Sequence, residues 1–186
     1  MNYYLIVLFL HIAGALGFFA MLGMEWTSLH QLRRATSIEQ VRAWMQVSAG
    51  TSRVGMISML LLFASGAYMT ATVWGGVAWI IVSLVTIVVL GVVATLLTRT
   101  PMAAIEKAVA VEHGPVSATL HQLLHQPRLR IAIQTRVAVS LGIVFLMTVK
   151  PDLSGSLLTI GIATVLGLLS AVSMPSRQRV QADMTM

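Results

Sequence analysis

The sequence predicts an all-α integral membrane bundle of five transmembrane helices, with the N-terminus outside and the C-terminus cytoplasmic. Of its 186 residues 57% are hydrophobic and only 10% are charged, whereas soluble domains carry about 25% charged residues. The apolar residues form five stretches, each near the roughly 20 residues that cross a bilayer. The Lys and Arg residues lie between these stretches and almost all on one side.

Each stretch is expected to be helical, because backbone polar groups in lipid must be satisfied within the segment. The stretches cover residues 3–26, 53–74, 77–97, 131–149 and 154–172. We expect one transmembrane domain over residues 1–174, a cytoplasmic helical loop at 100–127 and a loose polar tail at 175–186. A soluble helical bundle is disfavoured, since little polar sequence remains to cover five such runs.

The orientation follows from the basic residues. With the N-terminus outside, Lys150 is the one basic residue on the outer side, and eleven fall on the cytoplasmic side. These eleven are Arg33, Arg34, Arg42, Arg53, Arg99, Lys107, Arg128, Arg130, Arg136, Arg177 and Arg179. This bias is the positive-inside pattern, and we expect a multi-pass protein of a bacterial inner membrane. The first segment lacks a basic start and a small-residue cleavage site, so it is interpreted as a span.

Several local signals place the connections. The first span is expected to continue as helix past Trp26, and a short amphipathic helix over residues 38–47 is expected at the interface. Gly75-Gly76, between two tryptophans, predicts a tight outer turn. Thr100-Pro101 predicts the start of a new helix, and Gly114-Pro115 predicts a break before a second short helix.

Small residues at four-residue spacing predict close contacts between helices. The pattern occurs in the first, fourth and fifth spans, at Ala13 and Gly17, at Ala138 and Gly142, and at Ala163, Gly167 and Ala171.

His11 is the one histidine inside a span, and an ionisable residue there indicates a functional site. Neutral imidazole binds haem iron or copper. Met69 and Met147 lie at a depth that suits a second ligand, and the partner of a homodimer is another source. The alternative is a histidine that only hydrogen-bonds a neighbouring helix, with Tyr68 and Ser65 as partners.

Three further groups contain polar residues. Glu25, Arg53 and Arg136 share the cytoplasmic edge, where they predict either a structural ion-pair network or an anion site. His121 and His125 share one helix face at a spacing that suits a metal, or are two surface histidines. Lys150 and Asp152 mark the outer mouth, as an interface anchor or as a ligand group.

The chain has no cysteine, which excludes disulfides and thiolate metal sites. No P-loop, dinucleotide loop, nucleophile elbow or zinc-protease motif occurs. Nucleic acid is not expected as a partner, because the basic residues flank apolar runs. The expected partners are membrane lipids and a second copy or another membrane subunit.

Three motifs resemble a family of small bacterial integral membrane proteins, distantly similar to the CopD and HemJ-like membrane proteins. They are LHIAGALGF at residues 10–18, SRVG at 52–55 with SGAY at 65–68, and RVAVSLGIVFLMTVKPD at 136–152. The resemblance implies copper handling or haem b binding, with His11 as the histidine of an early helix. It also implies that Lys150 is the counterpart of the superfamily's intramembrane lysine.

Two functions are therefore expected. The first is a redox or metal-related membrane protein with His11 as a haem b or copper ligand. The second is a non-catalytic scaffold, or a carrier of small molecules or anions, that uses Glu25, Arg53 and Arg136. Whether the protein is an enzyme is left open by the sequence.

Overall fold

The computed structural model describes residues 3–173 and shows an all-helical bundle. Within these residues five helical stretches are long and apolar enough to cross a membrane, which confirms the predicted all-helical bundle with five helices of spanning length. The elements are α1 (Tyr3–Leu32), α2 (Ile38–Met69), a π-helical turn η1 (Thr70–Trp74), α3 (Ala78–Val111), α4 (Ala118–Leu124), α5 (Pro127–Val149) and α6 (Leu153–Ser173). The tail predicted at 175–186 lies outside the described residues.

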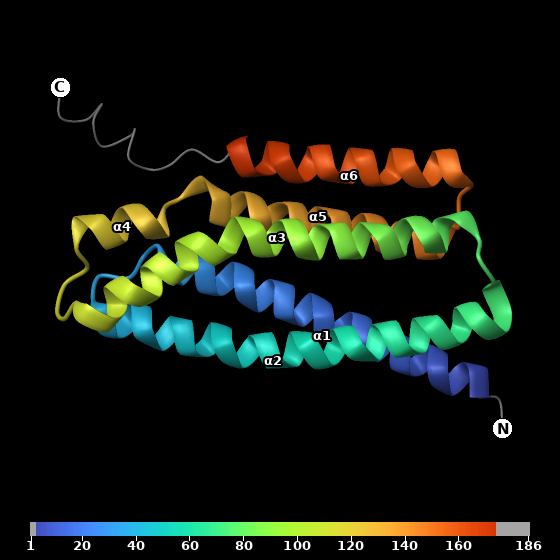
Figure 1. Cartoon of the computed structure of the whole chain (residues 1–186), viewed down its shortest axis with the longest axis horizontal. Coiled ribbons are helices and arrows are strands. Elements are labelled where there is room, and N and C mark those ends of the chain that lie inside the picture. The colour runs from blue at the N-terminus through green and yellow to red at the C-terminus, as the bar shows by residue number, and fades with distance from the viewer. Residues whose placement is uncertain (1–2, 174–186) are drawn as a thin grey trace.

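The helices form three layers (Figure 1). α1 packs along α2 in one layer, α3 and α5 form the middle layer, and α6 packs outside α5. The N-terminus, η1 and the α5–α6 connection lie at one end of the bundle, and α4 lies at the other (Figure 1). We call these the N-terminal end and the α4 end.

Small residues allow α1 and α2 to approach closely. A Cβ atom added at Gly14 would lie 3.2 Å from the Ser58 carbonyl oxygen and 3.2 Å from Leu62 Cγ. Gly17 faces the Ser58 hydroxyl, and Gly55 of α2 faces the Met21 side chain. The absent side chains therefore leave room for the neighbouring backbone, as is common between membrane helices.

Small residues also allow α5 and α6 to approach closely. A Cβ atom at Gly142 would lie 3.0 Å from Ala163 Cβ, and one at Gly167 would lie 2.8 Å from Thr135 Cα and 3.2 Å from Ala138 Cβ. The small-residue spacing in the fourth and fifth spans thus identified a real contact.

A buried hydrophobic cluster closes the α4 end. It joins residues from five helices, and its side chains are at most 5% exposed. Its members are Leu32, Ile38, Val41, Ile105, Val109, Leu120, Leu124 and Leu129. Arginines reinforce it: Arg33 donates to the carbonyl oxygens of Leu124 at 3.0 Å and Gln126 at 3.2 Å, and Arg42 donates to Val109 at 3.1 Å.

The separate interfacial helix expected at residues 38–47 is not present, because α2 runs unbroken from Ile38 to Met69. In the polar middle of α2, hydroxyls donate to carbonyl oxygens of the preceding turn: Thr51 donates to Val47 at 2.9 Å and Ser52 to Ser48 at 3.1 Å. Ser37 caps the start of the helix by accepting from the Gln40 backbone N–H at 3.3 Å.

The helix start predicted at Thr100-Pro101 is wrong, because Pro101 lies inside α3. The ring removes one backbone donor, but Pro101, Ile105 and Val109 are all buried. Their burial holds the helix together past the proline. The predicted break at Gly114-Pro115 is present, with Gly114 at φ 83°.

Candidate functional site

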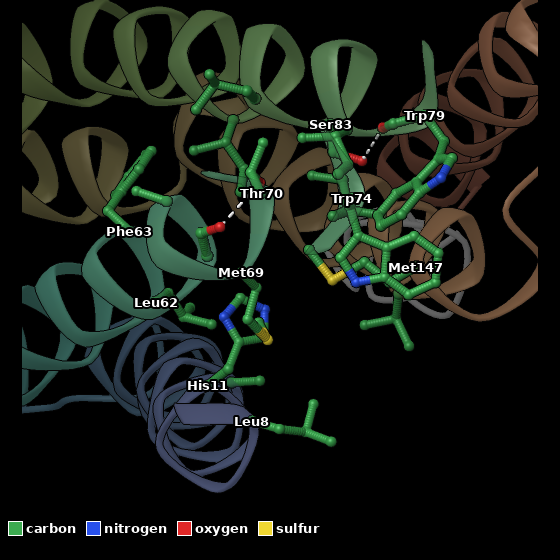
Figure 2. A pocket seen from close by; sticks show the side chains of 18 of the residues that line it. Leu8, His11, Leu62, Phe63, Met69, Thr70, Trp74, Trp79, Ser83 and Met147 are labelled. Atoms are coloured by element: carbon green, nitrogen blue, oxygen red, sulfur yellow. Dashed lines mark hydrogen bonds between the residues drawn. The ribbon is translucent and has the colours of Figure 1, made fainter. Parts of the chain in front are cut away.

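A cavity of about 570 Å³ lies between the α1–α2 layer and the α3–α5 layer, in the half of the bundle toward the N-terminal end. We call it the large cavity (Figure 2). Its wall is mostly apolar and includes five Phe and Trp side chains: Phe18, Phe19, Phe63, Trp74 and Trp79. The two layers have few close backbone contacts, and side chains line the space that is left between them.

His11 projects from α1 into the large cavity and is tied to α2. Its Nδ1 lies 3.0 Å from Ser65 Oγ, and the Ser65 hydroxyl lies 2.5 Å from the Leu61 carbonyl oxygen. A hydroxyl has one proton to donate. Since Ser65 donates it to Leu61, its oxygen accepts from Nδ1–H of His11. The opposite ring nitrogen, Nε2, then keeps its lone pair and can bind a metal.

Two neighbours of Ser65 on α2 have different roles. Gly66 lies against the imidazole, because a Cβ atom added there would be 3.4 Å from His11 Cε1. Tyr68 is 44% exposed on the outside of the bundle and does not line the large cavity. Of the two hydroxyl partners expected for His11, the structure brings Ser65 to the ring and leaves Tyr68 away from it.

Met69 of α2 and Met147 of α5 also line the large cavity. Figure 2 shows both thioethers extending into the same space as His11. Met69 is 9% exposed, so its side chain belongs to the interior. The structure therefore places His11 and both predicted methionines around one cavity.

Lys150 ends α5 and lies at the mouth of the large cavity. It adopts a left-handed backbone conformation at φ 53°. Its Nζ lies 3.9 Å from the centroid of the Trp74 ring, a cation–π contact. Trp74 in turn meets Trp79 edge to face, with centroids 5.7 Å apart. The two tryptophans flank the turn as predicted, but their role as cavity wall was not predicted.

Asp152 is not part of the large cavity. Its carboxylate accepts from the Gly155 backbone N–H at 2.8 Å and from the Ser154 hydroxyl at 2.9 Å, at the start of α6. These hydrogen bonds lower the pKa of the Asp152 carboxyl. Asp152 therefore caps a helix and is separate from Lys150 in function.

The π-helical turn η1 widens α2 where it meets the large cavity. The Gly75 backbone N–H donates to Thr70 at 2.8 Å, five residues back, and Gly75 has φ 64°. Thr70 and Trp74 both line the cavity. Such turns occur often at functional sites.

A second cavity, of about 290 Å³, lies toward the α4 end, and we call it the small cavity. Glu25 of α1 and Arg136 of α5 line it and form an ion pair across the layers. Within residues 3–173 this ion pair does not include Arg53, which is exposed and does not line the cavity. The predicted three-residue cluster is therefore a pair.

The two cavities share part of their walls. Four residues line both: Phe18, Met59, Ile87 and Ser140. The space between the layers thus extends from Lys150 past His11 to the Glu25–Arg136 pair.

His121 and His125 lie outside both cavities, on and just after α4. Their rings stack with centroids 4.1 Å apart, and His125 Nδ1 lies 2.8 Å from the His121 carbonyl oxygen. No group of three His, Cys, Asp or Glu side chains suited to a metal occurs in the part of the chain that the structure describes. The structure therefore adds no third ligand to this pair.

No family model, curated protein or solved structure matches this chain. The interpretation of the cavities therefore rests on the residues themselves.

Proposed function

We propose that the protein is a membrane redox protein that binds haem b in the large cavity, with His11 as the iron ligand. One observation carries the proposal: Nδ1 of His11 lies 3.0 Å from the Ser65 hydroxyl, which itself donates to Leu61. We infer from these contacts that the ring proton is on Nδ1 and that Nε2 is available as a ligand at an apolar cavity of about 570 Å³. Histidine ligands of haem and other metals are commonly oriented by such a hydrogen bond.

The volume of the large cavity favours haem over a bare copper ion. Cofactor sites span about 300–1,000 Å³, and the cavity of about 570 Å³ falls in that range. Thioethers do select Cu(I), and Met69 and Met147 would supply them. A single ion, however, would leave most of this apolar space unfilled, whereas a planar macrocycle would fill it.

The remaining residues of the large cavity fit the same group. Met69 or Met147 would provide a second ligand, and aromatic side chains would contact the macrocycle. Lys150 at the mouth offers a cation for the carboxylates of haem. When bound, haem supplies one-electron redox chemistry, and a His–Met ligand pair raises its potential.

We also propose that the N-terminus is outside and the C-terminus cytoplasmic, in a bacterial inner membrane. The support is the distribution of Lys and Arg, eleven against one. The large cavity then lies in the outer half of the membrane. A fluorescent reporter at the C-terminus is expected to fluoresce, and a phosphatase reporter there is expected to be inactive.

The test of the haem proposal is the visible spectrum of the full-length protein purified in detergent, before and after dithionite. A Soret band is expected, and His11→Ala should remove it. The matched control is His30→Ala, which changes an exposed histidine on the same helix and should leave the band unchanged.

Two results would overturn the proposal. One is a colourless preparation that also binds no added haemin. The other is a stoichiometric copper content that disappears in His11→Ala, because that would make the site a copper site.

A further inference from the structure

The Glu25–Arg136 pair leaves hydrogen-bonding groups unused at the wall of the small cavity. Arg136 donates to Glu25 through Nη2, and its Nε is buried without an acceptor among the described residues. A guanidinium has five N–H donors, and the Arg136 and Glu25 side chains are 21% and 19% exposed. Because Nε is buried, the donors open to a ligand in the small cavity are the remaining Nη N–H groups of Arg136, beside the Glu25 carboxylate.

The charge of the pair determines which molecule fits. Glu25 already neutralises Arg136, so an added anion would leave an unbalanced negative charge in a mostly apolar space, which is costly. A neutral carbonyl oxygen can accept from the guanidinium without adding charge. The ligand should therefore carry a carbonyl group and no net charge.

The rest of the small cavity indicates an apolar ligand that arrives from the bilayer. Six of the twelve residues that line it are methionine, phenylalanine, isoleucine or leucine. Met56 of α2 lines it and is 62% exposed on the surface of the bundle. Gly91 lies opposite on α3 and is also exposed. Since α2 and α3 touch at few positions, the cavity is accessible between them.

We propose that the small cavity binds the carbonyl head group of a neutral, lipid-soluble molecule with the chemistry of an isoprenoid quinone. Arg136 donates to the carbonyl oxygen, and Glu25 keeps the guanidinium neutralised and in place. The tail leaves between α2 and α3. The proposal stands on the small cavity alone and does not require haem in the large cavity.

The experiment measures binding of decylubiquinone, a neutral quinone with a ten-carbon tail, to the full-length protein in detergent by equilibrium dialysis. Decanoate, an anion with a tail of similar length, is the comparison ligand. Decylubiquinone is expected to bind at least about tenfold more tightly than decanoate. Equal or tighter binding of decanoate would overturn the charge argument.

Variants locate the site. Arg136→Gln should weaken decylubiquinone binding about tenfold or more, because the variant removes a charged donor. Arg53→Gln removes the same charge from an exposed position outside the cavity and should change nothing. Loss of binding in both variants would show a general charge effect and would contradict the proposal.

A second pair of variants leaves the ion pair intact. Gly91→Leu places a side chain at the wall of the small cavity, and Gly161→Leu places one on the outside of α6. A Cβ atom at either glycine meets nothing within 4 Å, so both variants should fold. Only Gly91→Leu should reduce binding. If His11→Ala reduced binding and Gly91→Leu did not, the quinone would lie in the large cavity and the proposal would be wrong.

Discussion

His11 and Ser65 connect the first two helices by a hydrogen bond of 3.0 Å between Nδ1 and Oγ. The Ser65 hydroxyl also contacts carbonyl oxygens of its own helix, those of Leu61 and Leu62, at 2.5 and 3.2 Å. Because the Ser65 hydroxyl donates its proton to the α2 backbone, its oxygen acts as the acceptor for Nδ1–H of the imidazole. This arrangement sets the tautomer of His11, and with it the chemistry that the large cavity can support.

Ser65→Ala is expected to change the tautomer of His11. Without the serine oxygen, Nδ1–H loses its acceptor, and a larger share of the ring should carry its proton on Nε2. Nitrogen NMR of the labelled imidazole would measure this. Haemin affinity should fall about tenfold, as when other groups that orient a metal-binding histidine are removed. Ser83→Ala is the control, since Ser83 also lines the large cavity but donates to Trp79 on its own helix. The same tautomer in wild type and Ser65→Ala would contradict the assignment.

Removing one member of the ion pair should destabilise the bundle. Glu25→Gln leaves Arg136 without its counter-ion, and we expect the free energy of unfolding to fall by about 1–3 kcal/mol. Denaturant titration in detergent would measure it. A double-mutant cycle with Arg136→Gln should show a coupling between the two residues, whereas Arg53→Gln should stay within about 0.5 kcal/mol of wild type. Purely additive effects of Glu25→Gln and Arg136→Gln would show that the pair contributes nothing to stability.

Gly167→Ala should loosen the contact between α5 and α6. The added methyl would approach the Thr135 Cα atom to 2.8 Å, and backbone cannot move aside as a side-chain tip can. We expect a loss of about 1–3 kcal/mol in the free energy of unfolding. At Gly161 of the same helix the added Cβ meets nothing within 4 Å, so Gly161→Ala should be neutral or stabilising by up to about 1 kcal/mol. Equal behaviour of both variants would argue against the close approach.

Asp152 should make the stability of the bundle depend on pH in the acid range. Its pKa is lowered from the ordinary 3.8 by the hydrogen bonds from Gly155 and Ser154. The ionised carboxylate therefore stabilises the folded state fully above the unfolded pKa, and this contribution is lost as pH falls through the lower folded pKa. Asp152→Ala should melt below wild type at pH 7, with a difference that narrows below about pH 4. A constant difference between pH 7 and pH 3 would exclude this role.

The membrane architecture was predictable because hydrophobicity and small-residue spacing act locally along the chain. The spacing predicted close contacts between helices, and Gly142 and Ala163, which both belong to this pattern, lie at such a contact. The unbroken course of α3 through Pro101, in contrast, was not predicted. Proline predicts a helix start from its own backbone, but burial of Ile105 and Val109 in the α4-end cluster overrides that preference.

The sequence predicted how deep in the membrane the residues of the candidate site lie, but not which face of each helix points into the bundle. Met69 and Met147 were expected near His11 by depth, and Lys150 was expected at the outer mouth; all three line the large cavity. Arg53 has a suitable depth too, yet Ser52, Gly55 and Met56 form the helix face that lines the small cavity. Residue 53 lies on another face of α2, and only packing shows which face points inward.

The two ends of the bundle are packed differently, and this difference affects how a large ligand enters and leaves the large cavity. At the α4 end, buried leucines and arginine hydrogen bonds join the helices. Toward the N-terminal end a cavity of about 570 Å³ lies between the layers. The two layers should therefore separate at the N-terminal end, while the helices stay joined at the α4 end. A bulky planar guest could then be exchanged sideways with the lipid while the protein stays folded.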